Sequence, residues 1–587
     1  MTMIKKLTGL VLAYLILASA LQCAVAQKEK EGPNILYIIC DDLNDYIGVT
    51  GGHPQAITPN LDRLAQSGIS FTNTACNYPV CMASRASMIY GLYPHTEQFF
   101  DVKSPLFHQG PYVRERLHSY IEYFKKSGYA VYGAGKIYHN LMAPEGTWSD
   151  DEGNSIYSVP PNWGPFPGDG KMNATLTEPA KEEYLAKQQY FAHGEFEGMQ
   201  SMWTLSSLDG TPFDNHPKLP EDFNSGTAYA SLDEIPNSNG CDGWYLYDKP
   251  YRYNNEDDRD PMPDEMTAEF ICGLIEKGFD RPFMLSVGIV RPHTPLYVPK
   301  KYMDLYPLET LQMPLGIKEG DISDIAEDLG RNRNKPKIPY GSHGFHEYDL
   351  LNGYKEGEGV REFLQAYLAC ITFVDEQVGK ILEALESSPY ADNTLIVFTS
   401  DNGYHIGEKE QVYKGSLWEE SCRIPLIIAG PGIKAGEVCS LPVSLVDLYP
   451  TFLDYSGLSA HPNKELGGPE LDGYSLRPLL ENPQGVWDGP EVSLSALGSD
   501  ANHHHKTKPD KHAQHYSVRS ERYRYIRSAS GQEELYDMKE DPHCWTNIAG
   551  DPEMKPMKEN LFAQMMELID RREPYEIFQC WMNPQER

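Results

Sequence analysis

The feature that most constrains the fold of this chain is a set of continuous apolar runs. Asn34–Cys40 reads NILYIIC and Thr394–Ser400 reads TLIVFTS, and residues 283–290 and 424–429 form two further runs. A strand with one face in solvent alternates apolar and polar residues, whereas a strand buried on both faces does not. The runs therefore predict strands of a sheet that is covered on both sides.

Helical patterns lie between these runs. Residues 265–277 and 361–386 carry apolar side chains at helical spacing, and Asp264 is the expected N-cap of the first segment. Alternating strand and helix signals favour a large α/β sandwich.

The composition excludes several classes of protein. The 587 residues include 51 Lys and Arg against 84 Asp and Glu, a formal net charge of −33, and 40% are hydrophobic. That apolar content excludes a disordered chain. This acidity argues against nucleic acid and anionic membrane as main partners, because proteins that bind either one usually carry an excess of Lys and Arg. A polyanionic substrate stays compatible with the charge, since a basic pocket can lie within an acidic surface.

The N-terminus has the pattern of a secretory signal peptide over residues 1–26. Lys5 and Lys6 precede an apolar run over residues 7–21, and residues 24–26 form an A-x-A cleavage signal before Gln27. A retained membrane anchor is disfavoured because the run is shorter than the roughly 20 residues that span a bilayer. Lipid attachment at Cys23 is also disfavoured, because the preceding residues form a poor lipid-attachment box. We expect an exported protein, periplasmic or secreted, with no membrane contact after cleavage.

The eleven cysteines include no C-x-x-C pair, so a cysteine zinc site is not expected. Export allows one or two disulfides, but the sequence does not determine their pairing.

Two regions depart from the α/β rhythm. Residues 145–260 are rich in Pro, Gly, aromatic and acidic residues, and either line a sugar site or form an insertion with local packing. Residues 441–587 resemble a smaller second unit, with strand signals at 491–495 and 523–528 and a helix near 558–571.

Acidic and amide side chains follow two of the predicted strands. Asp41 and Asp42 end the first, and Asp401 and Asn402 end another. Open α/β sheets place ligands at the carboxyl ends of their strands. Three carboxylates and an amide oxygen suit Ca²⁺ or Mg²⁺. Each pair alone is more typical of a helix cap or a turn, but two such pairs after two buried strands favour a metal site.

A second chemical signal is the segment Pro-Val-Cys-Met-Ala-Ser-Arg over residues 79–85. A helix that starts just after Cys81 would direct backbone N–H groups at an anion, with Arg85 one turn away. The segment CMASR, followed by ASMIYG, resembles the signature of the sulfatase family, in which the cysteine is converted to formylglycine. Further segments match that family in order: NILYIICDDL (34–43), TPNLDRL (58–64), GKIYH (135–139), RPHTP (291–295), TSDNG (399–403), KGS (414–416) and ELYDMKEDP (534–542).

The resemblance covers nearly the whole mature chain and is strongest to the iduronate-2-sulfatase and choline-sulfatase branches, on residues 287–308 and 407–409. It implies an alkaline-phosphatase-like α/β sandwich, with a large mixed, mostly parallel sheet between helices and a smaller C-terminal α+β subdomain. The catalytic domain would span residues 33–440.

The resemblance also implies roles for individual residues. Hydrated formylglycine at Cys81 would attack sulfur, and one Ca²⁺ ion would be held by Asp41, Asp42, Asp401, Asn402 and the modified Cys81. Arg85 and Lys136 would stabilise the nucleophile and the sulfate, and His139 would take a proton when sulfate is expelled. His293 and Lys414 would bind sulfate and supply a proton to the leaving alcohol.

One departure from the signature concerns maturation. Ala83 stands where the family usually has proline, which points to a bacterial formylglycine-generating maturase of the oxygen-independent kind.

Further residues are candidates for contact with the substrate. Substrate contacts are expected at His405, Gln98, Asp101 and His108. The His run at 503–505 is more typical of an exposed loop than of a metal site.

The expected activity is hydrolysis of sulfate esters of a sulfated carbohydrate, such as a glycosaminoglycan or algal polysaccharide fragment. Three alternatives stay open: hydrolysis of phosphate esters or phosphonates, hydrolysis of choline sulfate, and glycan binding without catalysis.

Overall fold

The computed structural model describes residues 32–97, 99–100, 111–139, 143–144, 146–149, 251–294, 296–329, 357–499 and 510–573, and the backbone of 166–167, 229–231, 244–246, 249–250 and 342–344. The predicted signal peptide, most of the 145–260 insertion and the His run at 503–505 lie outside these residues. Gln98, Asp101 and His108 also lie outside them. Within the described part, no helix combines the length and apolarity needed to cross a bilayer.

The centre of the protein is an eight-stranded mixed sheet in the order β17-β2-β16-β13-β1-β10-β3, with β18 paired to β2. Four neighbouring strands, β13, β1, β10 and β3, run parallel, while β16 is antiparallel to both β13 and β2. This confirms the predicted mixed, mostly parallel sheet. Its strands are β1 (Asn34–Cys40), β2 (Gly68–Ala75), β3 (Ala130–Gly135), β10 (Phe283–Gly288), β13 (Thr394–Ser400), β16 (Arg423–Ala429), β17 (Glu437–Cys439) and β18 (Val443–Ser444).

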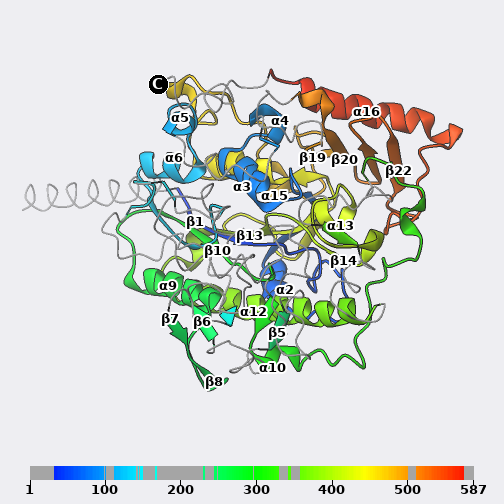
Figure 1. Ribbon diagram of the computed structural model, residues 1–587. Coiled ribbons are helices and arrows are strands. Elements are labelled where there is room, and N and C mark those ends of the chain that lie inside the picture. The colour runs from blue at the N-terminus through cyan, green and yellow to red at the C-terminus, as the bar shows by residue number, and fades with distance from the viewer. Residues whose placement is uncertain are drawn as a thin grey trace, which may run out of the picture.

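Helices cover both faces of this sheet (Figure 1). One layer contains α2 (Pro59–Gln66), α9 (Pro263–Lys277) and α12 (Glu358–Glu386). The opposite layer contains α3 (Cys81–Tyr90), α6 (Tyr120–Lys126), α14 (Leu448–Tyr455) and α15 (Arg477–Glu481).

Strand β1 explains the continuous apolar runs. Its residues Tyr37 and Ile39 pack in the core with α3, α6 and α14, whereas Leu36 and Ile38 pack in the core with α2, α9 and α12. Successive side chains of a strand point to opposite faces, so a strand between two helical layers must be apolar at every position.

The C-terminal unit is a four-stranded antiparallel sheet in the order β19-β20-β21-β22 with α16 against it. Leu494 of β19 and Leu561 of α16 belong to the same hydrophobic cluster as Ala83 of α3, so this unit shares the main core. The helix predicted near residues 558–571 begins three residues earlier, at Lys555. Pro556 lies in its first turn, where a proline is tolerated. The elements are β19 (Ser493–Leu497), β20 (His515–Arg519), β21 (Tyr523–Arg527), β22 (Glu533–Asp537) and α16 (Lys555–Asp570).

Shorter elements complete the described chain. They are α4 (Pro94–Glu97), α5 (Pro111–Arg114), α10 (Lys300–Met303), α13 (Glu419–Cys422), β4 (Phe166–Pro167), β5 (Tyr229–Ser231), β6 (Trp244–Leu246), β7 (Lys249–Tyr251), β8 (Tyr253–Asn255), β9 (Asp258–Arg259), β11 (Leu296–Val298), β12 (Ser342–Gly344), β14 (His405–Ile406) and β15 (Gln411–Tyr413).

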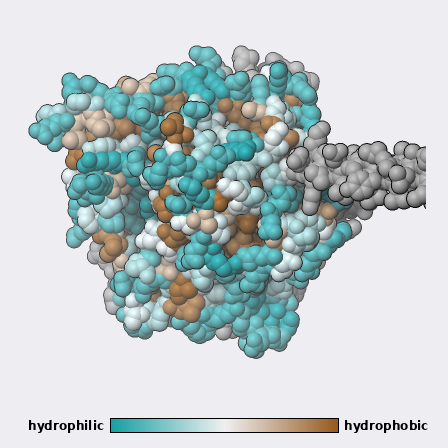
Figure 2. All heavy atoms as spheres, turned by 180° about the vertical axis from the view of Figure 1, so that it is seen from behind, coloured by the Kyte–Doolittle hydropathy of each residue, from teal (hydrophilic) through white to brown (hydrophobic). Residues whose placement is uncertain are grey.

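The face of the protein seen in Figure 2 is mainly hydrophilic. Figure 2 shows apolar residues on one face in small groups separated by hydrophilic ones. Within the described residues, the exposed large apolar side chains come from distant parts of the sequence: Ile57, Leu305, Leu315, Val438 and Val486.

Candidate active site

The two acidic strand ends lie side by side. β1 and β13 are parallel neighbours with Cys40 opposite Ser400, so the residues that follow each strand emerge at the same edge of the sheet. The backbone N–H of Asp42 donates to Asp401 Oδ1 at 3.2 Å. Asp41, Asp42, Asp401 and Asn402 are all buried, with at most 1% of each exposed. The structure thus brings together the four residues that the sequence singled out.

Two oxygens in this group have no hydrogen-bond partner. Asp41 Oδ1 and Asn402 Oδ1 are both buried and unpaired, while the Asn402 amide nitrogen donates to Asp42 Oδ1 and to Gly403 O, each at 2.8 Å. The three carboxylates offer oxygens within 4.8 Å of one another. Buried oxygens without donors are costly unless a cation occupies the space. The donor set therefore fits a hard divalent cation such as Ca²⁺.

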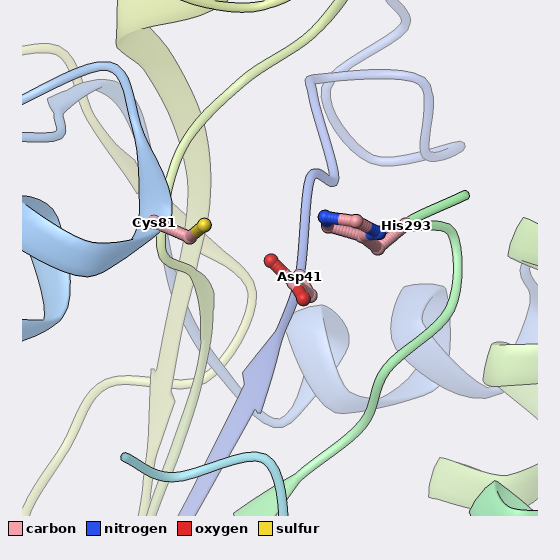
Figure 3. Close-up of side chains that lie close together, drawn as sticks. All are labelled: Asp41, Cys81 and His293. Carbon is pink, nitrogen blue, oxygen red and sulfur yellow. The ribbon is translucent and has the colours of Figure 1, made fainter. Parts of the chain in front are cut away.

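Cys81 is the first residue of α3 and points into this space. Figure 3 shows the Asp41 carboxylate between the Cys81 thiol and the His293 ring, and ligand atoms of the three lie within 4.8 Å of one another. Burial raises the pKa of the Cys81 thiol above its ordinary value, although Lys136 and Lys414 oppose this effect. An unmodified Cys81 is therefore a neutral thiol and a weak nucleophile at pH 7.

Arg85 connects the helix to the strand ends. It lies one turn after Cys81, and its Nε donates to Asp401 Oδ2 at 2.7 Å. Its Nη1 donates to the backbone carbonyls of Lys136 and Ile137, and its Nη2 is 3.9 Å from Asp41 Oδ1. One fully buried guanidinium thus joins α3 to the loops after β13, β3 and β1.

Two lysines complete the cationic side of the site. Lys136 Nζ pairs with Asp41 Oδ2, and Lys414 Nζ pairs with Asp42 Oδ1 and is 3.7 Å from Cys81 Sγ. Three carboxylates therefore face three cations, Arg85 included. A bound divalent cation would leave this balanced group with a net positive charge.

The carboxylates respond differently to burial. Burial alone raises the pKa of Asp41, but Lys136, Arg85 and Lys414 outweigh it, so the pKa is lowered. For Asp42, burial dominates over Lys414, and the pKa rises to about 7. Asp41 is thus the more firmly ionised of the two and the stronger anchor for a cation.

His293 faces the site as a neutral ring. Its Nδ1 donates to the carbonyl of Thr294 at 2.6 Å, which leaves Nε2 3.6 Å from Asp42 Oδ2. Burial, together with Lys414 and Lys136, holds the pKa of His293 well below its ordinary value. A second anion at this position would counter the lysines and favour protonation of Nε2.

The expected helix cap at Asp264 is wrong, and the residue has another task. Its carboxylate accepts the backbone N–H groups of Val290 at 2.8 Å and Arg291 at 3.1 Å, and so holds the loop that carries His293. The side chain at the helix N-cap position is Met262 instead. Nothing local marks this role, because the two partners lie more than 25 residues further along the chain.

His405 makes buried contacts within the protein, and its expected role in substrate binding stays a prediction. The ring is fully buried at the start of the β14–β15 hairpin, with Nε2 2.6 Å from Ser416 Oγ and Nδ1 3.9 Å from Glu420 Oε2. Burial, reinforced by Lys409, lowers its pKa to about 3. His405 therefore packs inside the protein and supports the segment that carries Lys414.

His139 lies in the loop after β3, three residues beyond Lys136, and is buried. Its predicted role in proton transfer stays a prediction.

Comparison with known proteins agrees with this architecture. The Sulfatase family model matches residues 33–458, and a model of the N-sulphoglucosamine sulphohydrolase C-terminal region matches residues 407–571. A sulfatase of Formosa agariphila is 30% identical over 92% of this chain and 87% of its own length.

Two further relatives lie in the branches expected from the motifs. A choline-sulfatase of Rhizobium meliloti is 25% identical over 89% of this chain and 83% of its own. Human iduronate 2-sulfatase is 26% identical over 76% of this chain and 67% of its own.

Solved structures share the fold. A phosphonate monoester hydrolase of Agrobacterium radiobacter has a TM-score of 0.61 at 22% identity, over 92% of this chain and 96% of its own. A structure bound to D-glucosamine-2-N,6-O-disulfate has a TM-score of 0.59 at 19% identity, over 93% of this chain and all of its own. The matched family model, the sulfatase relatives and the common fold lead to one conclusion: this chain belongs to the sulfatase family and is a sulfuric ester hydrolase.

Proposed function

We propose that the protein is an exported, Ca²⁺-dependent sulfatase that removes sulfate from a sulfated carbohydrate, with formylglycine made from Cys81 as its nucleophile. The observation that carries the proposal is the balanced buried group of three carboxylates and three cations beside Cys81, with two oxygens that lack donors.

Asp41, Asp42, Asp401 and Asn402 would hold the cation. When bound, Ca²⁺ supplies a fixed positive charge that lowers the cost of negative charge developing on sulfate oxygens. Asp41 and Asp42 would then have a stronger partner than Lys136 and Lys414, so both ammonium groups become available to an anion. A sulfate ester fits the net positive charge that results.

The remaining residues would bind the ester and move protons. The guanidinium of Arg85 keeps the Asp401 carboxylate and the Lys136 loop in place at the N-terminus of α3. Lys414 is near enough to Cys81 Sγ to neutralise charge on a nucleophile at that position. His293 Nε2, protonated once sulfate is bound, would donate to the oxygen of the departing alcohol.

Two observations support a carbohydrate substrate. Human iduronate 2-sulfatase, a relative over most of the chain, is named for a sugar residue. The predicted signal peptide would deliver the enzyme to a compartment where extracellular saccharides are available.

The first experiment measures sulfate release by the chain produced together with a maturase that accepts Ala83. Its substrates are sulfated mono-, oligo- and polysaccharides, with choline sulfate, an aryl phosphate and a phosphonate ester as further arms. Cys81→Ala should abolish release, whereas Cys272→Ala, which removes a half-buried thiol from α9, should leave it unchanged.

Release from a sugar sulfate, absent in Cys81→Ala and absent with both phosphorus esters, would establish the proposed activity. Turnover of choline sulfate or of a phosphorus ester alone would replace the carbohydrate assignment with that substrate. If peptide mass shows formylglycine at position 81 and no ester is cleaved, the catalytic proposal for these substrates fails.

The location is tested separately. The exported protein should begin at Gln27 by intact mass, and a chain that retains residues 1–26 would contradict the predicted cleavage.

A further inference from the structure

Two cysteines outside the candidate active site lie opposite each other at the adjacent ends of two paired strands of the main sheet. Cys76 follows the last residue of β2, and Cys422 precedes the first residue of β16. The neighbouring pair Ala75 and Arg423 is in antiparallel register, and the Cys76 N–H donates to the Cys422 carbonyl at 2.9 Å. Directly opposed residues of an antiparallel pair have Cβ atoms about 4.5–5.5 Å apart. A disulfide needs a Cβ–Cβ distance of about 3.5–4.5 Å, so closure requires a backbone shift of about 1 Å.

The two thiols also interact. Of the eight cysteines within the described residues, Cys76 and Cys422 are the two whose ionisation is coupled through a direct thiol–thiol interaction. Both are fully buried, with Cys76 Sγ 3.5 Å from Ser421 O and Cys422 Sγ 3.6 Å from Ser416 O.

The environment differs between the partners. Burial, and then the neighbouring Cys422 thiol, raises the pKa of Cys76. Burial opposes ionisation of Cys422 as well, but Cys76 and Arg524 outweigh it and lower the Cys422 pKa. Cys422 is therefore the better nucleophile of the pair.

We propose that Cys76 and Cys422 are a redox pair that closes to a cross-strand disulfide when the chain meets a disulfide oxidant. The Cys422 thiolate attacks one sulfur of the oxidant and releases its other sulfur as a thiolate. The Cys76 thiol then gives up its proton and attacks Cys422 Sγ in the mixed disulfide, which releases the second half of the oxidant. Two protein thiols are oxidised, and one external disulfide is reduced to two thiols.

A disulfide between Cys76 and Cys422 would join two segments that carry candidate active-site residues. Cys76 begins the segment that leads to Cys81, and Cys422 ends the segment that begins at Lys414. These segments already touch, because the Gly415 N–H donates to the Pro79 carbonyl at 3.1 Å. The disulfide would fasten the backbone before the nucleophile to the backbone behind Lys414. Its formation in the cell depends on the proposed export to an oxidising compartment, but the chemistry does not.

The test uses the purified full chain with reduced and oxidised glutathione. The chain is refolded from denaturant in glutathione disulfide, alkylated under denaturing conditions, and digested without reduction. We expect a peptide pair that joins Cys76 to Cys422, and two fewer titratable thiols per chain than in the reduced protein. Folded, reduced protein should react much more slowly, because both thiols are fully buried.

Variants identify the pair and its effect. Cys76→Ser and Cys422→Ser should each eliminate the linked peptide, whereas Cys439→Ser, at a buried thiol on the neighbouring strand β17, should retain it. Oxidised wild type should melt several degrees above reduced wild type, and the Cys76→Ser/Cys422→Ser double variant should show no such difference.

The proposal is overturned if both cysteines carry the alkylating label or separate glutathione adducts after refolding. Pairing of either one with a third cysteine, such as an unconverted Cys81, also overturns it. Peptide mass does not depend on sulfate release, so an inactive enzyme would leave this result unchanged.

Discussion

Stability below neutral pH should depend on His95 in α4. The ring is 2% exposed, its Nε2 is 3.2 Å from the carbonyl of Leu568 in α16, and it stacks on Tyr93 with ring centroids 5.2 Å apart. A carbonyl only accepts, so Nε2 carries the proton of the neutral ring. Burial lowers the pKa of His95 from 6.5 to about 3.

The sign and size of the effect follow from linkage. The unfolded chain binds a proton at this position below pH 6.5, and the folded protein does not until about pH 3. Stability from the neutral ring is therefore complete above pH 6.5 and is lost as the pH falls towards 3. From pH 7.5 to pH 5.5, a histidine with these two pKa values costs about 1.4 kcal/mol of unfolding free energy.

The assay is urea unfolding of wild type and His95→Gln at pH 7.5 and pH 5.5. Glutamine keeps an N–H donor for the Leu568 carbonyl but does not titrate. Other titrating groups cancel in the double difference, so wild type should lose about 1.4 kcal/mol more than the variant. His512→Gln, at a half-exposed ring that lies 3.2 Å from Asp570 Oδ1 in α16, is the matched control. Equal losses for wild type and His95→Gln would refute the reasoning.

Three further predictions concern buried charge. Glu97 is 1% exposed with neither carboxylate oxygen hydrogen-bonded, and burial, followed by Asp472, raises its pKa well above 4.5. The folded state therefore retains a proton that the unfolded state releases above pH 4.5. Glu97→Gln should raise the melting temperature at pH 7.5 and not at pH 4. A lower melting temperature of the variant at pH 7.5 would contradict this prediction. Ca²⁺ at 100 times its dissociation constant should stabilise the protein by about 2.7 kcal/mol relative to a chelator, and melting curves that are the same with calcium and with the chelator would argue against the cation site. The Lys409 ammonium is fully buried and pairs with Asp321 Oδ1 at 3.0 Å, so Lys409→Met should cost about 3–5 kcal/mol in urea unfolding, and Asp321→Asn should recover part of it. A loss in Lys409→Met that Asp321→Asn does not reduce would contradict the ion pair as the cause.

Features that depend on local residue patterns could be predicted from the sequence. The apolar runs of β1 and β13 predicted strands buried on both faces, because each position of such a strand must be apolar. The acidic residues after these strands and the motif around Cys81 located the edge of the sheet that carries the candidate active site. Parallel neighbours end at the same edge of a sheet, so the meeting of Asp41 with Asp401 followed once both strands were placed.

Which side chains pair at that edge of the sheet could not be predicted from the sequence and is seen in the folded structure. Three pairings join residues that are far apart in sequence. Lys414 pairs with Asp42, Asp264 holds the loop that carries His293, and Cys76 lies beside Cys422. His405 shows the same limit, because its contacts with Ser416 and Glu420 could not be read from its position four residues after Asp401. The local sequence pattern indicates whether a position is apolar or polar. Long-range packing determines which partner a polar group meets, because that choice depends on how distant segments come together in the folded core.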